Sequence, residues 1–240
     1  LTASGEALLD RARRTLHRME EDLEFVRGVG RGETGALRVG FIGSGMLTKL
    51  PAILGEYRRL YPGVELRLRE FYTSTLIDAL RDGSVDVGFL RDGGPIEDLD
   101  VEPVLVEKLI GVVSRHHRLA RQATIRVAQL KDEPFVFFPK FAGPTAWQRT
   151  MALCEEHGFQ AKIVQEAPHW VTILSLVDAG LGVTIAPDCI RKIAAKSIAC
   201  RPLSGHGATH IELAQRKGES RPVVREFCRL ARTRFRERVR

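Results

Sequence analysis

Long apolar runs are absent from this sequence, and cysteine is scarce. No stretch approaches the roughly 18 uncharged apolar residues that a helix needs to cross a bilayer, and residues 1–10 lack the basic patch and apolar run of a secretory signal. The four cysteines (Cys154, Cys189, Cys200 and Cys228) include no C-x-x-C pair. This spacing argues against a zinc knot or a redox pair, and each thiol is expected to fill a small space in the core. We therefore expect a cytoplasmic protein without a membrane segment.

The excess of positive charge is concentrated at one end of the chain. The net charge is +7, and residues 221–240 alone hold eight arginines against Glu226 and Glu237. Ser220 as a cap and Pro222 in the first turn predict a helix here. Its apolar stripe would consist of Val224, Phe227, Cys228, Ala231 and Phe235. A solvated arginine face is a simpler interpretation than a phosphate-binding surface, so the charge by itself does not indicate DNA contact.

The first segment of the chain has the pattern of a coiled coil. Apolar residues recur at spacings of 3, 4, 3, 4 and 3: Leu9, Ala12, Leu16, Met19, Leu23 and Val26. Charged residues occupy most other positions, so only one narrow seam is apolar. We expect a dimerisation helix that ends near Arg27, with glycine-rich residues 28–32 separating it from the first predicted strand. The alternative is that the seam packs on the body of the same chain.

Strands and helices alternate along the rest of the chain. Residues 37–42, 64–68 and 85–90 are predicted strands, with helices predicted at 50–60 and 75–81. After a connecting stretch at 101–126, the pattern repeats with strands at 135–138, 162–165 and 183–186 and helices at 144–157 and 170–179. Alternation of this kind predicts parallel sheets with right-handed crossovers. The expected fold is therefore α/β, with two Rossmann-like βαβαβ lobes and a ligand cleft between them.

The predicted boundaries follow from this pattern. Residues 1–32 form the helix and hinge, residues 33–113 with 208–240 form the first lobe, and residues 114–207 form the second. A strand at 210–215 and the basic helix are expected to return to the first lobe, which gives two crossovers between the lobes.

Small and polar residues gather where predicted strands end. Gly43-Ser44-Gly45 and Thr73-Ser74-Thr75 follow the first two strands, and residues 140–145 (from Lys140) begin the first helix of the second lobe. Ligands of open parallel sheets bind beyond the carboxyl ends of the strands, near the N-termini of helices. Hydroxyl groups there suit a carboxylate or another small anion. Each of these residues could also be a simple helix cap, but together they favour a binding site.

Enzyme signatures are missing. Gly43-Ser44-Gly45 does not match the G-x-S-x-G nucleophile elbow of hydrolases, and Thr48 breaks a dinucleotide fingerprint. His116-His117 lacks the spacing of metal ligands. Asp86, beside a buried strand, is expected to cap backbone groups. We expect no catalytic residue, no metal and no cofactor.

The motifs and their order resemble those of the LysR-type transcriptional regulators. The first lobe carries Leu37-Arg38-Val39-Gly40-Phe41, Leu50-Pro51, Tyr61-Pro62, Glu70 and the run from Gly83 to Phe89, and the second carries Asp178-Ala179-Gly180-Leu181-Gly182 followed by Val183-Thr184-Ile185-Ala186-Pro187. Leu1-Thr2-Ala3-Ser4-Gly5 is similar to the junction between that family's winged helix-turn-helix and its linker helix. The resemblance implies a periplasmic-binding-protein-like effector domain that dimerises or tetramerises. It also implies that a small metabolite between the lobes changes how a DNA-reading domain, absent from this chain, holds promoter DNA.

Within that family the chain looks most like the regulators of aromatic-compound degradation. The resemblance implies that Ser44 and Thr73 hold the carboxylate of an aromatic or unsaturated acid. It places further residues around the ligand, which join Ser74, Thr75 and Lys140 from the strand ends: Leu50, Phe89, Arg91, Pro139, Phe141, Glu166 and Ala167. Two alternatives remain, a two-lobed periplasmic solute-binding protein and an α/β enzyme. The sequence upstream of Leu1 would separate the regulator from the binding protein.

Overall fold

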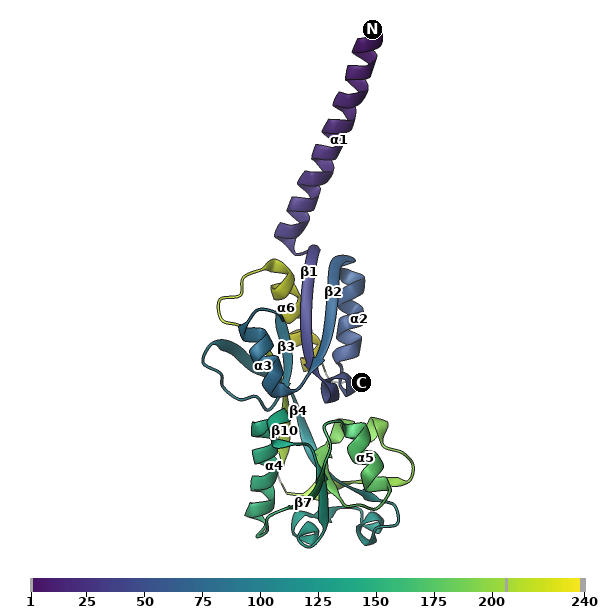
Figure 1. The fold of residues 1–240 in the computed structure, drawn as a ribbon, viewed down its shortest axis with the longest axis vertical. Helices are drawn as coiled ribbons and strands as arrows, with labels where there is room; N and C mark the ends of the chain where they lie inside the picture. The colour runs from purple at the N-terminus through teal and green to yellow at the C-terminus, as the bar shows by residue number, and fades with distance from the viewer. Residues whose placement is uncertain (1, 206, 238–240) are drawn as a thin grey trace.

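The computed structural model describes residues 2–205 and 207–237 and consists of a long helix and two lobes (Figure 1). The helix projects from one end, and the lobes follow along the same long axis. Leu1, predicted to begin the helix, and Arg238 and Arg240, predicted to extend the basic face, lie outside the described residues.

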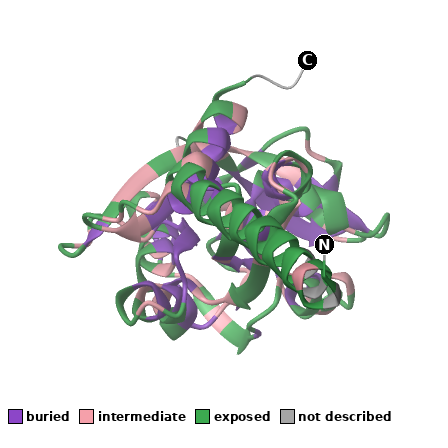
Figure 2. Cartoon of the chain, turned by 90° about the horizontal axis from the view of Figure 1, so that it is seen from above, coloured by how far each residue is buried: buried purple, intermediate pink, exposed green. Residues whose placement is uncertain are grey.

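Helix α1 (Ala3–Arg31) is longer than the sequence predicted. Thr2 caps its N-terminus by accepting a hydrogen bond from the Gly5 amide, and Gly32 ends it in the left-handed region at φ 73°. The expected end near Arg27 is wrong, because the helix continues through Gly28 and Gly30. Ion pairs from Arg31 to Glu24 and Glu33 stabilise this last turn. Most of α1 is exposed, as Figure 2 shows from above.

Lobe I is built on the predicted first βαβαβ unit. Strands β1 (Thr34–Ile42), β2 (Gly63–Phe71) and β3 (Val87–Arg91) are parallel, with β1 in the middle. Helices α2 (Leu50–Leu60) and α3 (Thr73–Arg81) connect them. The last helix, α6 (Pro222–Arg236), returns to this lobe, and its apolar stripe packs in the same core as β1 and α2. The C-terminal helix therefore packs on lobe I.

Two long strands join the lobes. Strand β4 (Leu99–Ser114) lies where the sequence predicted a connecting stretch, and that prediction is wrong. Strand β10 (Ala208–Arg216) runs antiparallel to both β3 and β4, so the sheet is mixed and not purely parallel. The register between β10 and β4 shifts at Ile211/Glu212, which marks a bulge near the crossover.

Lobe II contains the second set of predicted elements and further strands. The predicted set is β6 (Pro134–Phe137), α4 (Pro144–Glu156), β7 (Lys162–Glu166), α5 (Trp170–Asp178) and β8 (Thr184–Pro187). Two strands that the sequence did not indicate, β5 (Ile125–Arg126) and β9 (Ile198–Ser204), complete the lobe. The main sheet has the order β2-β1-β3-β10-β4-β9-β5 with β8 pairing β4, and β6 and β7 form a separate pair.

All four cysteines are buried and free, as expected for core residues. Cys228 lies in the core of lobe I, and the other three lie in the cores of lobe II. Burial raises the pKa of the Cys154, Cys189 and Cys228 thiols to about 12, which keeps them protonated and unreactive near neutral pH.

The arginines of α6 are paired more than the sequence indicated. Arg221, not Ser220, is the N-cap residue, and Pro222 follows it in the first turn. Arg229 pairs with Glu226 and Arg234 with Glu56, while Arg232 contacts Glu102 on β4. The basic face of this helix is therefore largely neutralised by neighbouring carboxylates.

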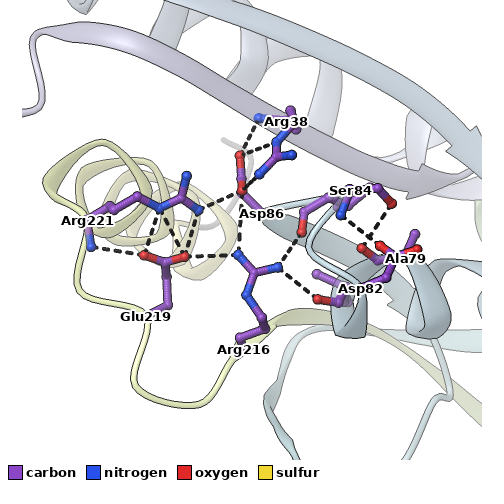
Figure 3. A network of polar contacts seen from close by, with 10 residues as sticks. Arg38, Ala79, Asp82, Ser84, Asp86, Arg216, Glu219 and Arg221 are labelled. Carbon is purple, nitrogen blue, oxygen red and sulfur yellow. Dashed lines mark hydrogen bonds and ion pairs between the residues drawn. The ribbon is translucent and has the colours of Figure 1, made fainter.

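Asp86 is the centre of a polar network at the beginning of α6 (Figure 3). Its carboxylate is fully buried and lies 2.6 Å from nitrogens of Arg38 and Arg221 and 3.6 Å from Arg216. It also accepts a hydrogen bond from the Arg38 amide, as predicted for a backbone cap, but the sequence did not predict the three arginines. Glu219 pairs with Arg216 and Arg221 and completes the network.

Candidate functional site: a cleft between the lobes

A cavity of about 560 Å³ lies between the two lobes. Lobe I contributes Ile42, Gly43, Ser44, Met46, Leu47, Glu70, Phe71, Tyr72, Thr73 and Arg91. Lobe II contributes Phe138, residues 142, 143 and 146 near the start of α4, residues 168–172 and Ile193. The volume is in the range of small-molecule sites, which is about 300–1,000 Å³.

Ser44 lies directly after β1, in a short 3₁₀ helix (Gly43–Leu47). Its side chain is almost fully buried, and its hydroxyl oxygen accepts a hydrogen bond from Nε of Arg91 at 3.1 Å. Because a hydroxyl can donate one hydrogen bond while accepting another, this contact leaves the Ser44 proton available to a ligand.

Thr73 is the first residue of α3 and is also almost fully buried. Its hydroxyl lies 3.4 Å from both the amide nitrogen and the carbonyl oxygen of Arg91. Ser44 and Thr73 follow neighbouring strands, β1 and β2, so the parallel pairing of these strands places both hydroxyls beside Arg91. The site therefore forms at the carboxyl ends of the strands, where open parallel sheets bind ligands.

Arg91 is buried in the cleft, but its charge is already balanced. One guanidinium nitrogen lies 2.8 Å from the Glu107 carboxylate on β4, and another donates to Thr209 on β10 at 3.2 Å. The second oxygen of Glu107 accepts a hydrogen bond from the Cys189 amide of lobe II. Arg91 thus fixes the geometry of the cleft and joins it to both crossover strands.

The rest of the cleft is mainly apolar. Ile42, Met46 and Leu47 line it from lobe I, and the rings of Phe138 and Trp170 line it from lobe II. The centroids of these two rings are 6.0 Å apart with their planes at 64°. A flat, partly apolar molecule with one anionic end fits this combination of walls and hydroxyl groups.

Three of the twelve sequence-predicted ligand residues line the cavity: Ser44, Thr73 and Arg91. Ser74 and Phe141 lie at its rim, where the Ser74 hydroxyl donates to the Phe141 carbonyl at 2.7 Å. Thr75 accepts a hydrogen bond from the Tyr72 amide, which is a capping contact within lobe I. Lys140 is exposed and lies over the ring of Trp147.

The other predicted residues are not brought to the cavity wall. Leu50 and Phe89 are fully buried in the core of lobe I, because their side chains point to the packed face of α2 and β3. Pro139 and Ala167 are buried beside wall residues, and Glu166 is exposed at the end of β7. None of these five is a lining residue in this structure.

Sequence reasoning did not identify Phe138 and Trp170 as wall residues. Phe138 follows β6 and Trp170 is the first residue of α5, after β7. The rule that selected Ser44 and Thr73 looked for small and polar residues at strand ends, so it passed over these two large aromatic side chains. Among the described residues, no group of three or more histidine, cysteine, aspartate or glutamate side chains could hold a metal ion. None of the helices within the described ranges has the length and apolarity that a membrane span requires.

Residues 30–236 match the family model of the LysR substrate binding domain. The HTH-type transcriptional regulator AlsR of Bacillus subtilis (strain 168) is 31% identical over 237 residues, which are 96% of this chain and 77% of that protein. ClcR of Pseudomonas putida, also an HTH-type regulator, is 28% identical and covers 96% of this chain and 79% of its own length.

Solved structures share the fold. The full-length regulator CbnR in complex with its target DNA superimposes with a TM-score of 0.83 at 24% identity, covering 98% of this chain and 81% of that one. The effector binding domain of BenM with its effector benzoate gives a TM-score of 0.73 at 24% identity, covering 83% and 91%. The two-lobed α/β fold, its cleft and these matches agree with one another. The chain therefore belongs to the LysR family of transcriptional regulators and contains the effector-binding domain of that family.

Proposed function

We propose that this domain binds a small carboxylate, an aromatic or unsaturated acid, in the cleft between its lobes. Binding would then change how the assembled regulator holds promoter DNA. The observation that carries the proposal is the position of Ser44. Its hydroxyl accepts from Arg91 and so keeps its own proton for a ligand beside the Thr73 hydroxyl.

The chemistry of the cleft supports an acid with an apolar body. Since Glu107 balances Arg91, the anion would be held by oriented hydroxyl donors and not by a net positive charge. Hydrogen bonds to a charged group contribute more than neutral ones, about 1.5–3 kcal/mol. Phe138 and Trp170 offer ring surface for the remainder of the molecule. The benzoate of the BenM domain is such an aromatic acid, which agrees with this proposal.

The wider assignment follows the family. We place the protein in the cytoplasm as a dimer or tetramer joined through the α1 seam, with promoter DNA bound by a winged helix-turn-helix outside this sequence. The proposed domain boundaries are residues 1–32, 33–113 with 208–240, and 114–207.

The proposal is tested by replacing both hydroxyls, Ser44→Ala with Thr73→Ala, and titrating a panel of aromatic and unsaturated monocarboxylates by calorimetry. Loss of one charge-assisted hydrogen bond should weaken binding about tenfold or more, since about 1.4 kcal/mol is a factor of ten. Ser175→Ala is the matched control, because Ser175 is exposed on α5 and its hydroxyl donates to the Val171 carbonyl of the same helix.

Thermal melts separate binding from stability. Ligand that binds only the folded state should raise the melting temperature of the parent and of Ser175→Ala, but not of the double variant. If the double variant melts lower yet binds the acids as tightly as the parent, both hydroxyls are structural and the proposed site is wrong.

A further inference from the structure

The rim of the cleft carries contacts between the two lobes. Ser74 and Tyr72 belong to lobe I, and Phe141 belongs to a short 3₁₀ helix of lobe II (Lys140–Ala142). Their contacts cross from one lobe to the other at the edge of the cavity.

We propose that Ser74, Tyr72 and Phe141 form a latch between the lobes that ligand must open in order to enter or leave the cleft. The latch, defined by these three residues, would set the rate of ligand exchange, while the hydroxyls of Ser44 and Thr73 set the affinity. The proposal rests in part on the proposed function, because exchange requires a ligand.

Two interactions of different chemistry hold the latch closed. The Ser74 hydroxyl donates to the Phe141 carbonyl at 2.7 Å. The Tyr72 and Phe141 rings meet edge to face, with centroids 5.8 Å apart and planes at 88°. Edge-to-face contact is a favourable arrangement for an aromatic pair. On lobe I the two contacts come from residues two positions apart at the start of α3, and on lobe II both go to Phe141, so they break together when the lobes separate.

The surroundings favour a latch over a fixed interface. The Phe141 side chain is 63% exposed, so its ring is held on one face only and can swing into solvent. Tyr72 lies beside His169 as well, with ring centroids 6.4 Å apart, so the Tyr72 ring has a second contact on lobe II. By contrast, the backbone of Gly143 in lobe II approaches Thr73 of lobe I closely, since a Cβ added at Gly143 would lie 4.0 Å from the Thr73 hydroxyl oxygen.

The latch explains why Ser74 and Phe141 lie near the site without lining it. If the latch is closed in both the ligand-free and the ligand-bound protein, its contacts stabilise both states equally and do not change the dissociation constant. They then affect only the energy barrier between the two states. Weakening it should therefore raise association and dissociation rates together.

The protein supplies its own optical probe. Trp147 and Trp170 are its two tryptophans, and Trp170 lines the cavity. In a Trp147→Phe background, Trp170 fluorescence reports on the cleft alone. The first measurement uses no ligand: acrylamide quenching of Trp170 should rise about twofold in Phe141→Ala and to a smaller extent in Ser74→Ala. Leu181→Ala, which removes another exposed apolar side chain of lobe II, and Ser175→Ala should leave quenching unchanged.

The second measurement is stopped-flow fluorescence with whichever carboxylate of the panel the parent binds. Phe141→Ala should raise both rate constants about tenfold and Ser74→Ala about threefold, with dissociation constants within about threefold of the parent. Unchanged quenching in both latch variants refutes the latch whatever the ligand is. A changed dissociation constant with unchanged rates of association also refutes it, since the residues would then be part of the binding surface. If no acid binds the parent but quenching rises as expected, the latch stands and the proposed ligand class fails.

Discussion

The buried carboxylate of Asp86 should contribute measurably to the stability of lobe I, and its contribution should depend on pH. Burial by itself raises the pKa of this carboxyl, but hydrogen bonds from Arg38 and Arg221 outweigh burial and lower the pKa from 3.8 to about 2. The charged form is therefore favoured in the folded protein. A depressed pKa of this kind means that the stabilisation is fully present above pH 4 and is lost as the pH falls towards 2.

The magnitude follows from the shift. A displacement of about 2 pKa units corresponds to about 2.5 kcal/mol, because each unit is 1.36 kcal/mol. The side chains of Arg38, Arg216 and Arg221 are 27–42% exposed, so solvent screening reduces this to about 1–2 kcal/mol. Asp86→Asn also removes the charged partner of Arg38 and leaves Arg216 and Arg221 to share the Glu219 carboxylate. We therefore expect Asp86→Asn to lower the free energy of unfolding by about 2 kcal/mol at pH 7.

Urea denaturation of the parent and Asp86→Asn between pH 7 and pH 3 measures this directly. The difference in unfolding free energy should be largest at neutral pH and should shrink by about half at pH 3. At pH 3 the Asp86 carboxyl is mostly protonated in the unfolded parent but still mostly charged in the folded parent, so unfolding is accompanied by proton uptake. Asp98→Asn is the control, since Asp98 pairs with Arg81 in an exposed position and its loss should have little effect. Equal stability of Asp86→Asn and the parent at pH 7, or a difference that does not change with pH, would contradict the argument.

Two further predictions concern α1. Leu16→Asp combined with Leu23→Asp should lower the mass seen by light scattering, because both side chains are exposed on the chain itself and a partner helix would have to bury the new charges; an unchanged mass would exclude the seam as the dimer contact. Gly32→Ala should cost at least about 1 kcal/mol in urea denaturation, since φ is 73° and the new Cβ would lie 2.7 Å from the Pro222 carbonyl carbon. Gly30→Ala, inside the helix with no atom within 4 Å, should instead be neutral or stabilising, and equal effects of the two changes would refute the steric argument.

Local patterns were sufficient for most of the helices and for the strands of the two βαβαβ units. Helices such as α2 and α3 have a buried face that recurs at a fixed spacing, and β3 and β8 are short apolar runs that are buried throughout. Local patterns failed for β4. The first half of this strand is partly exposed and contains Pro103, whereas Leu109 to Ser114 is buried throughout, so no single period spans it. Its main partner, β10, comes about one hundred residues later and runs in the opposite direction, which no local pattern encodes.

The candidate site divides in the same way. Ser44 and Thr73 follow neighbouring parallel strands, so the sequence could place their hydroxyls together, whereas Arg91 at the end of β3 was expected there from the family resemblance. Phe138 and Trp170 meet them only because two lobes face each other across a cleft. Leu50 and Phe89 were expected at the ligand, but their side chains lie on the faces of α2 and β3 that pack in the core of lobe I. Helix α6, which comes much later in the sequence, packs in this core and so determines which faces are buried. The rim contacts of Ser74 and Phe141 likewise depend on the approach of the lobes.

Helix α1 is connected to the cleft through lobe I. The C-terminal cap of α1, Gly32, lies against the backbone of Pro222 at the start of α6, so no side chain can separate the two helices there. Arg221, the cap of α6, is held by Asp86 of lobe I, and the stripe of α6 is buried in the lobe I core. Helix α1 is thus fixed to lobe I, while lobe II is attached through β4 and β10, with a bulge at the crossover. A change in the angle between the lobes would therefore rotate lobe II relative to lobe I and α1, which would move as one body. In an oligomer joined through α1, the same change would move each lobe II relative to the joined helices.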